Sequence, residues 1–293
     1  MDLNATSWRM LLLPLVFLLP GACQPALTPD QQSELGRALV IAAHRGDSAE
    51  VRRLLDLGVD VDSRCGEAPG STFQGKDGGW PTASARWTAL IAAASSDRDP
   101  AEPGGHLGVV GVLIARKASL DLHDGYGATA LYQAVYGCRR REAAQIAFAL
   151  LAAGAEVNTR TGVYIDGPGD TTPLHRAIGS PDLVKALLDR GARVDAVTTH
   201  GDTPLHWAVR HRDIGCAKLL LAAGADPNLR DKEGRTALHG VSSIRRKEEM
   251  RKLLLNNKDL SDDEKADVLK LLEARVEPQG DLEMLLREAG ARD

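Results

Sequence analysis

One stretch of this 293-residue chain nearly spells a phosphate-binding loop. Residues 70–77 read Gly-Ser-Thr-Phe-Gln-Gly-Lys-Asp, but Asp77 stands where the loop needs Ser or Thr to hold magnesium. The loop also needs a helix directly after it, and Gly78, Gly79 and Pro81 argue against one. We therefore interpret residues 70–77 as part of a surface loop, and we expect no cofactor and no small-molecule substrate.

Histidine is the side chain most often used in acid–base and metal chemistry, and it occurs eight times. Three of the eight, His175, His206 and His239, recur at the fourth position of a short phrase that begins with Thr. Such recurrence favours a structural role, in which a ring nitrogen ties the start of a helix to the neighbouring turn. His211 is five residues from His206, so the two do not share a helix face as a metal-binding pair would. The acidic residues at 97–102 lack the Gly and the closing Glu of a calcium loop. We predict neither a metal site nor a catalytic residue.

The cysteines and the charge balance also carry little chemical signal. Cys65, Cys138 and Cys216 form no Cys-x-x-Cys pair, which argues against a zinc site. We expect Cys216 to pack within a helix, and a disulfide between Cys65 and Cys138 is left open. The net charge of −4 gives no basic footprint, so we expect no nucleic acid partner.

A phrase that occurs five times accounts for the histidines. It begins at Thr88, Thr129, Thr172, Thr203 and Thr236. Thr is suited to cap a helix N-terminus, and Pro or Ala follows at the first helical position. A second phrase places Gly after an apolar helix, where Gly can end it in the left-handed conformation. The period near 33 residues predicts a solenoid of stacked helix-turn-helix units.

The unit resembles the ankyrin repeat, most closely at residues 201–208, which read Gly-Asp-Thr-Pro-Leu-His-Trp-Ala, and at residues 218–228. The resemblance implies an all-α fold, an ankyrin-repeat solenoid of stacked helix-turn-helix units with protruding turn tips. The first unit lacks the Thr phrase, as suits a capping unit. We expect the second half of the last unit near residues 267–278 and a C-terminal capping helix at 279–293. The six expected units span residues 34–65, 86–124, 127–160, 170–200, 201–233 and 234–278.

Three insertions set this chain apart from a plain array. They lie at residues 66–85, 97–106 and 163–169, and they are rich in Gly, Pro and charge. Long loops on a rigid scaffold are candidate sites of specificity. Trp80 and Tyr164 lie within these insertions, and we treat both as candidate partner-binding residues.

The N-terminus resembles a bacterial lipoprotein signal. Residues 10–19 form an apolar run that is too short to span a bilayer, and Gly and Ala precede Cys23. We expect residues 1–22 to be a signal peptide, Cys23 to be lipidated, and residues 23–33 to form a linker. The expected location is the bacterial cell envelope, at the periplasmic side of the outer membrane or the cell surface. The alternative is a cytoplasmic protein whose signal is not processed.

The resemblance implies a non-enzymatic module that binds proteins through its turn tips and its concave face. It places Tyr126, His200 and Lys232 at tips and Trp207 at the concave side, and aromatic residues are common interface anchors. We expect a monomer that binds an unknown protein and is tethered to a membrane. One alternative is a dedicated periplasmic inhibitor or immunity protein for a single enzyme or toxin. A less favoured alternative is an enzyme with its chemistry in the inserted loops.

Overall fold

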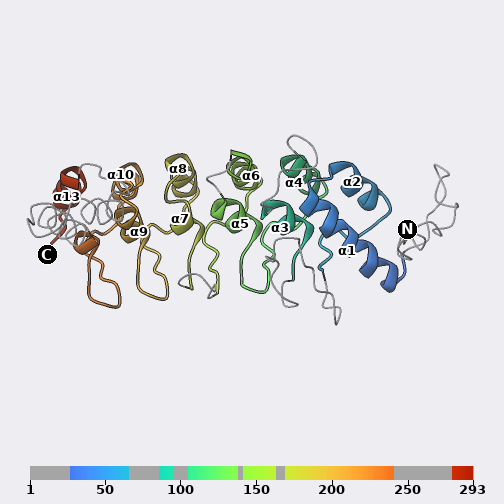
Figure 1. Ribbon diagram of the computed structural model, residues 1–293, viewed down its shortest axis with the longest axis horizontal. Coiled ribbons are helices and arrows are strands. Elements are labelled where there is room, and N and C mark those ends of the chain that lie inside the picture. Colours follow the sequence, from blue (N-terminus) through green and yellow to red (C-terminus); the bar gives the residue numbers. More distant parts are fainter. Residues whose placement is uncertain are drawn as a thin grey trace, which may run out of the picture.

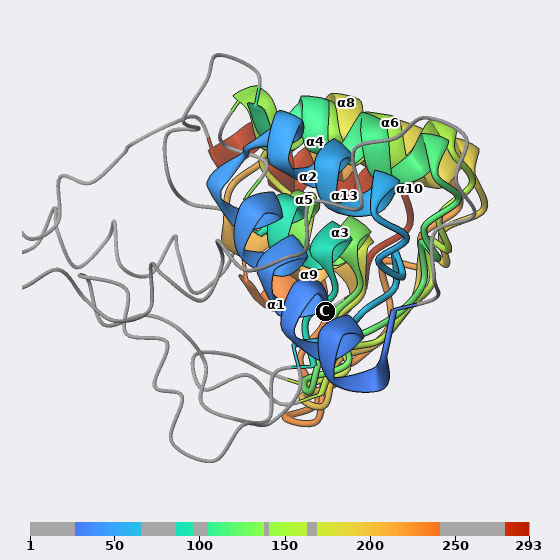
Figure 2. The same cartoon turned by 90° about the vertical axis from the view of Figure 1, so that its right-hand side faces the viewer.

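The structure is a computed structural model that describes residues 27–65, 86–95, 105–137, 141–162, 169–240 and 279–292. Within these ranges the regular elements are α-helices, stacked in pairs along one row (Figure 1). Seen along the row, one layer of helices lies above a second, and long turns project from the opposite side (Figure 2). None of the described helices is long and apolar enough to cross a membrane. The predicted signal segment, Cys23, Trp80, Tyr164 and Cys138 lie outside the described residues.

Each unit contributes one inner and one outer helix. The inner helices are α1 (Pro29–Arg45), α3 (Ala89–Ala94), α5 (Ala130–Tyr136), α7 (Pro173–Arg176) and α9 (Pro204–Arg210). The outer helices are α2 (Ser48–Asp56), α4 (Gly105–Ala115), α6 (Arg141–Ala152), α8 (Pro181–Asp189) and α10 (Ile214–Ala222). A final helix, α13 (Gln279–Glu288), follows at the C-terminal end.

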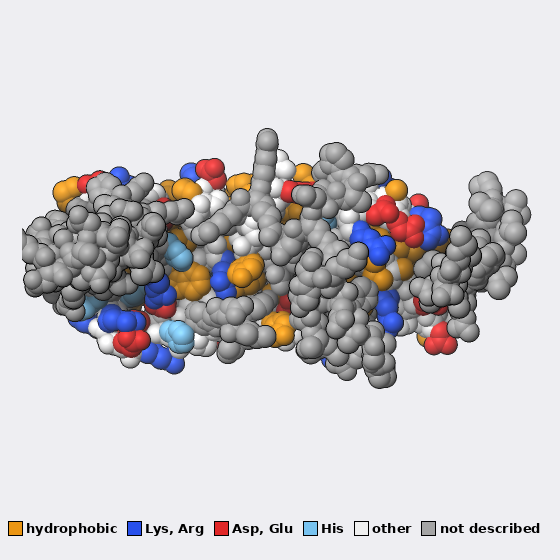
Figure 3. Space-filling view, viewed as in Figure 1, with side chains coloured by type: hydrophobic (Ala, Val, Ile, Leu, Met, Phe, Trp, Pro, Cys, Tyr) orange, Lys and Arg blue, Asp and Glu red, His pale blue; other side chains and the backbone are white. Residues whose placement is uncertain are grey.

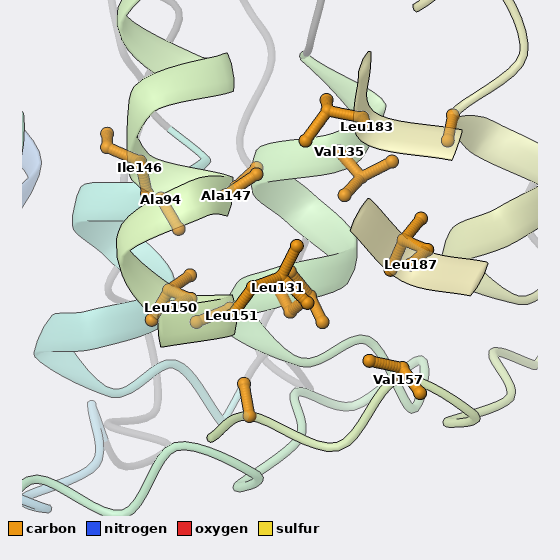
Figure 4. Close-up of a cluster of buried hydrophobic side chains, with 14 of the residues drawn as sticks. Ala94, Leu131, Val135, Ile146, Ala147, Leu150, Leu151, Val157, Leu183 and Leu187 are labelled. Atoms are coloured by element: carbon orange, nitrogen blue, oxygen red, sulfur yellow. The ribbon is translucent and has the colours of Figure 1, made fainter. Parts of the chain in front are cut away.

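The core runs continuously between the two layers. Leu131 of α5, Leu150 of α6 and Leu183 and Leu187 of α8 are fully buried and meet across two neighbouring units (Figure 4). A unit of about 33 residues cannot enclose these side chains by itself, so its apolar face is buried only by the next unit.

The Thr phrase caps α3, α5 and α9 as predicted. The hydroxyl oxygens of Thr88 and Thr129 accept hydrogen bonds from the amides of Ile91 and Tyr132, each at 3.3 Å. Lys117 stands where other units place Gly, and it still adopts the left-handed conformation, with φ of 60°. This conformation is unfavourable for a residue with a Cβ atom, so the stack imposes the turn geometry even where the sequence lacks glycine.

The first unit begins earlier than predicted. Helix α1 starts at Pro29, because Thr28 caps it and Gln31 completes a reciprocal capping box. The expected linker at residues 23–33 is therefore partly helical. The next residue, Gln32, accepts a hydrogen bond from the amide of Asp60 at 3.3 Å and donates one to the carbonyl of Gly58 at 3.0 Å. The extra turns of α1 thus cap the open end of the row.

A second boundary also differs from the prediction. The expected insertion at residues 97–106 overlaps α4, which begins at Gly105. His106 is buried in that helix, and its Nε2 atom lies 3.0 Å from the carbonyl oxygen of His44.

A ladder of hydrogen bonds joins the closing turns, which are the turns that end the outer helices of successive units. At each step an Asp or Asn side chain in one closing turn accepts a hydrogen bond from a backbone amide in the next closing turn. The donor is the residue that follows the Ala after the helix-ending Gly or its equivalent. The acceptors and the residues that donate to them are Asp62 and Ser119, Asp121 and Glu156, Asn158 and Arg193, Asp195 and Asp226, and Asn228 and Arg292. The ladder therefore runs unbroken to the end of the described chain.

The last step of the ladder, from Asn228 to the turn after α13, indicates the place of α13 in the stack. Asn228 donates to the carbonyl of Gly290 at 3.1 Å and accepts from the amide of Arg292 at 2.9 Å. Asn158 makes the same two bonds to Gly191 and the amide two residues later. Helix α13 also packs against α10 in the outer layer (Figure 1). It therefore lies where an outer helix of the sixth unit is expected. The predicted second half near residues 267–278 lies outside the described residues, so the division between that half and a capping helix stays a prediction.

This assignment predicts a large effect of a core substitution in α13. Leu286 is 0% exposed and Met284 is 56% exposed on the same helix. We expect Leu286→Ala to lower the free energy of unfolding by about 2–5 kcal/mol, because it leaves a cavity in the core. Met284→Ala is the matched control and should change it by less than about 0.5 kcal/mol. Urea unfolding measures both, and equal small losses would contradict the assignment.

Candidate recognition surface

The projecting turns are held rigid by buried carboxylates. Asp124 is 3% exposed, and its Oδ1 atom accepts from the amides of Tyr126 and Ala128 at 2.8 and 3.0 Å. Asp231 accepts in the same way from the amides of Glu233 and Arg235, each at 2.9 Å. Burial by itself would raise the pKa of Asp231, but these amides and the Arg235 guanidinium hold that pKa below its usual value. The turns therefore present a preformed backbone.

Backbone hydrogen bonds link neighbouring turns into one continuous edge. The amide of Gly162 donates to the carbonyl of Tyr126, that of Thr199 to Gly169 and that of Lys232 to His200, at 2.6, 2.9 and 2.9 Å. We call this edge the tip strip and define it by these six residues.

Glycine at position 201 is required by this close approach of the turns. Gly201 has φ of 81°, and a Cβ atom there would lie 2.9 Å from the amide nitrogen of Lys232. Both the backbone conformation and the spacing of the tip strip therefore depend on the absence of a side chain.

The structure places the predicted tip residues on this strip. His200 and Lys232 are exposed, and Tyr126 is half-buried. The predicted insertion at residues 163–169 leaves the tip strip at Gly162 and rejoins it at Gly169, which itself accepts the bond from Thr199. Binding of a partner by these side chains stays a prediction.

Two of the repeated histidines, His175 and His206, are structural tethers between units, as predicted. The Nε2 atom of His175 donates to the carbonyl of Asp202 in the next unit at 3.1 Å, and its Nδ1 atom accepts from the amide of Thr172 at 3.2 Å. His206 makes the equivalent bond to the carbonyl of Arg235. Burial lowers the pKa of His175 to about 4, so this ring is neutral at neutral pH.

This lowered pKa predicts an acid-sensitive fold. Below a pH of about 6.5 the unfolded chain binds a proton at position 175 that the folded chain does not. The contribution of His175 to the free energy of unfolding is therefore fully present above that pH and is lost as the pH falls towards 4. We expect His175→Gln to remove about 2–3 kcal/mol from the difference in unfolding free energy between pH 7 and pH 4.5. Urea titrations at both pH values measure this difference. His200→Gln, at an exposed tip, should leave it unchanged, and an unchanged difference in His175→Gln would contradict the tether.

The concave side carries a cluster of one arginine and three aromatic rings. The Cζ atom of Arg176 lies 5.9 Å from the ring centroid of Tyr132, 4.8 Å from that of Tyr136 and 5.3 Å from that of Trp207. The predicted anchor Trp207 is only 8% exposed, because its ring packs edge-on against His175 and beside His211. Hydrophobic, basic and histidine side chains lie close together on the side of the molecule shown in Figure 3.

Other chemistry-bearing residues are accounted for by packing. Burial, with a smaller contribution from Asp213, raises the pKa of the Cys216 thiol to about 12, so it stays protonated. Burial also raises the pKa of the half-buried Cys65. Among the described residues, no group of three His, Cys, Asp or Glu side chains is arranged to hold a metal ion.

Comparison with known proteins supports the repeat assignment. Residues 145–231 match the family model described as ankyrin repeats (3 copies). The chain is 52% identical over 58 residues to the Ankyrin repeat and LEM domain-containing protein 1 homolog of Caenorhabditis elegans, which is 20% of this chain and 8% of that protein. It is 36% identical over 129 residues to the Nuclear factor NF-kappa-B p105 subunit of Mus musculus, which is 42% of this chain and 12% of that protein. The chain thus spans a small part of these relatives, and the likeness concerns their repeats.

A solved structure is similar over a longer stretch. The match covers 70% of this chain and 91% of the other, at 28% identity and a TM-score of 0.51. That other chain belongs to the complex of the Bd0816 predatory endopeptidase from Bdellovibrio bacteriovorus with the immunity protein Bd3460. Together with the helical architecture, these findings show that the described chain is an all-α ankyrin-repeat solenoid. Repeats of this kind generally bind other proteins and carry no catalysis of their own.

Proposed function

We propose that this ankyrin-repeat solenoid is a binding protein that blocks one enzyme of the cell envelope, as an immunity protein does. The observation that carries this proposal is the likeness to a chain of the endopeptidase–immunity protein complex, which extends over 91% of that chain. The relatives named above share only 8% and 12% of their lengths with this chain, so the proposal does not rest on them.

We infer that the matched chain is the immunity protein. An endopeptidase needs a catalytic nucleophile or a metal with its ligands. In the described part of this chain, the repeat histidines are tethers, Cys216 is a buried thiol, and no His, Cys, Asp or Glu group is arranged for a metal. A fold shared with the inhibiting partner agrees with these features.

The tip strip supports the same proposal. Its turns are preorganised by buried carboxylates and by backbone bonds from one turn to the next, so little conformational entropy is lost on binding. A rigid, narrow edge of this kind suits insertion at the rim of an enzyme cleft.

Inhibition can be tested directly. The Cys23→Ser chain, immobilised, is used to capture proteins from an envelope extract of the source cells, and each captured enzyme is assayed with and without the free chain. We expect the peptidase activity of one captured enzyme to fall to background at an equimolar ratio. If the captured enzymes keep full activity at a large excess of the chain, the inhibitor function is wrong.

A pair of double variants assigns the surface that inhibits. His200→Ala with Lys232→Ala removes two exposed tip side chains, and Lys185→Ala with Lys218→Ala removes two exposed side chains from α8 and α10. The tip variant should raise the inhibition constant at least about tenfold, equivalent to about 1.4 kcal/mol. The outer-helix variant should leave it unchanged, and the reverse pattern would place the contact on the outer layer.

We also propose that the chain is lipid-anchored through Cys23 in the cell envelope. The apolar run at residues 10–19 and the small residues before Cys23 support this proposal. Several acyl chains hold a protein at a membrane stably, whereas a single chain binds marginally. Cells grown with a fatty-acid analogue should label the wild type and not Cys23→Ser. Label that persists in the variant would exclude Cys23 as the lipidated residue.

A further inference from the structure

Arg176 occupies an unusual position on the concave side. Its equivalents in the neighbouring units are Gln133 and Trp207, the residues that follow the fourth position of the Thr phrase. The guanidinium lies close to the rings of Tyr132 and Tyr136 of α5 and to the indole of Trp207 of α9. Aromatic faces attract a guanidinium and hold it in one plane. Three consecutive inner helices therefore fix one cationic group in place.

The guanidinium of Arg176 is not neutralised by any carboxylate in the described chain. Its Nε atom donates to the Tyr132 hydroxyl at 2.7 Å, and that hydroxyl is paired with the Thr171 hydroxyl at 2.7 Å. Two other arginines in this part of the molecule differ, because Arg210 pairs with Asp202 and Arg235 pairs with Asp231. Arginine has five donors in a planar fork, and the single bond through Nε leaves the outer edge of the Arg176 fork available to an acceptor.

Trp207 supplies a second and independent observation. Its Nε1 atom is buried and has no hydrogen-bond partner among the described residues, in a side chain that is 8% exposed. Leaving a buried donor without an acceptor destabilises a fold, and native proteins rarely do so without a reason. This donor belongs to the ring whose centroid is 5.3 Å from the Arg176 guanidinium carbon.

We propose that Arg176, Tyr136 and Trp207 form a binding site for a carboxylate, namely that of an Asp or Glu side chain of the protein partner. The guanidinium fork binds both oxygens, as arginine and carboxylate geometries match. Tyr136, which is 59% exposed, and the ring of Trp207 lie beside the guanidinium and flank the pair. A carboxylate is favoured over a phosphate because a single guanidinium faces this position. The inference rests on the proposed function in requiring a protein partner, but it does not require that partner to be an enzyme.

Small probes test the site without knowledge of the partner. The full chain with Cys23→Ser is labelled with ¹⁵N at its four Trp residues, and Trp207→Phe identifies the indole signal of Trp207. The chain is titrated at constant ionic strength with acetyl-Ala-Glu-Ala-amide, which carries one side-chain carboxylate. We expect a saturable shift of the Trp207 indole signal. Acetyl-Ala-Gln-Ala-amide is the neutral control and should give none, so equal shifts with the two probes would overturn the proposal.

Variants separate the site from general charge effects. Arg176→Gln can still bond to the Tyr132 hydroxyl, and we expect it to weaken binding of the acidic probe at least tenfold. Arg176→Lys keeps the charge and loses the planar fork, so its affinity for the probe should lie between those of the wild type and Arg176→Gln. Arg193→Gln removes an exposed arginine from a closing turn and should bind as the wild type does. Thermal unfolding of each variant checks that the fold is intact, and an unaltered shift in a folded Arg176→Gln would refute the site.

Two further probes identify the source of the ligand. Acetyl-Ala-Ala-Ala with a free C-terminal carboxylate tests capture of a chain terminus, and inorganic phosphate tests a phosphate site. Tighter binding of either than of the Glu probe would contradict the assignment to an acidic side chain. These titrations contain no enzyme, so a negative result leaves the inhibition experiment unaffected, and a positive result does not depend on it.

Discussion

The hydrogen bonds that pass from each unit to the next are the interaction on which the rest of this structure depends. No single unit can bury its own leucines, so stability comes from stacking. Apolar contact alone would allow neighbouring units to slide, whereas the ladder from Asp62 to Asn228 and the tether from His175 to Asp202 fix their spacing. The register of the turn tips and the meeting of three inner helices around Arg176 both follow from this spacing.

Most of the fold was predictable from the sequence, because the same capping and tethering residues recur in each repeat. Thr caps and the His tether recur at fixed positions, and the structure confirms them. The first and last helices of the solenoid were harder to predict from the sequence. The capping box at Thr28 was a readable signal that the repeat period obscured. Helix α13 begins 39 positions after residue 240, and only the Gly290 that ends it, as Gly ends other outer helices, marked it as an outer helix.

The surface was harder to predict, because it depends on contacts between units. Trp207 was predicted as a partner-binding residue on the concave side, and packing against His175 leaves its side chain 8% exposed. The Arg176 cluster joins residues 44 positions apart that no local pattern connects. Sequence identified the scaffold well, since the scaffold repeats. The side chains around Arg176 do not repeat, so only the three-dimensional structure brings them together.

We propose that this solenoid binds its partner through the tip strip and the concave face. Hydrogen–deuterium exchange of the chain, alone and bound to a captured partner protein, tests this proposal most directly. We predict slower exchange in the complex at the turns around Tyr126, His200 and Lys232 and in helices α5, α7 and α9. Slower exchange confined to α6, α8 and α10 would contradict the claim, because those helices form the outer layer.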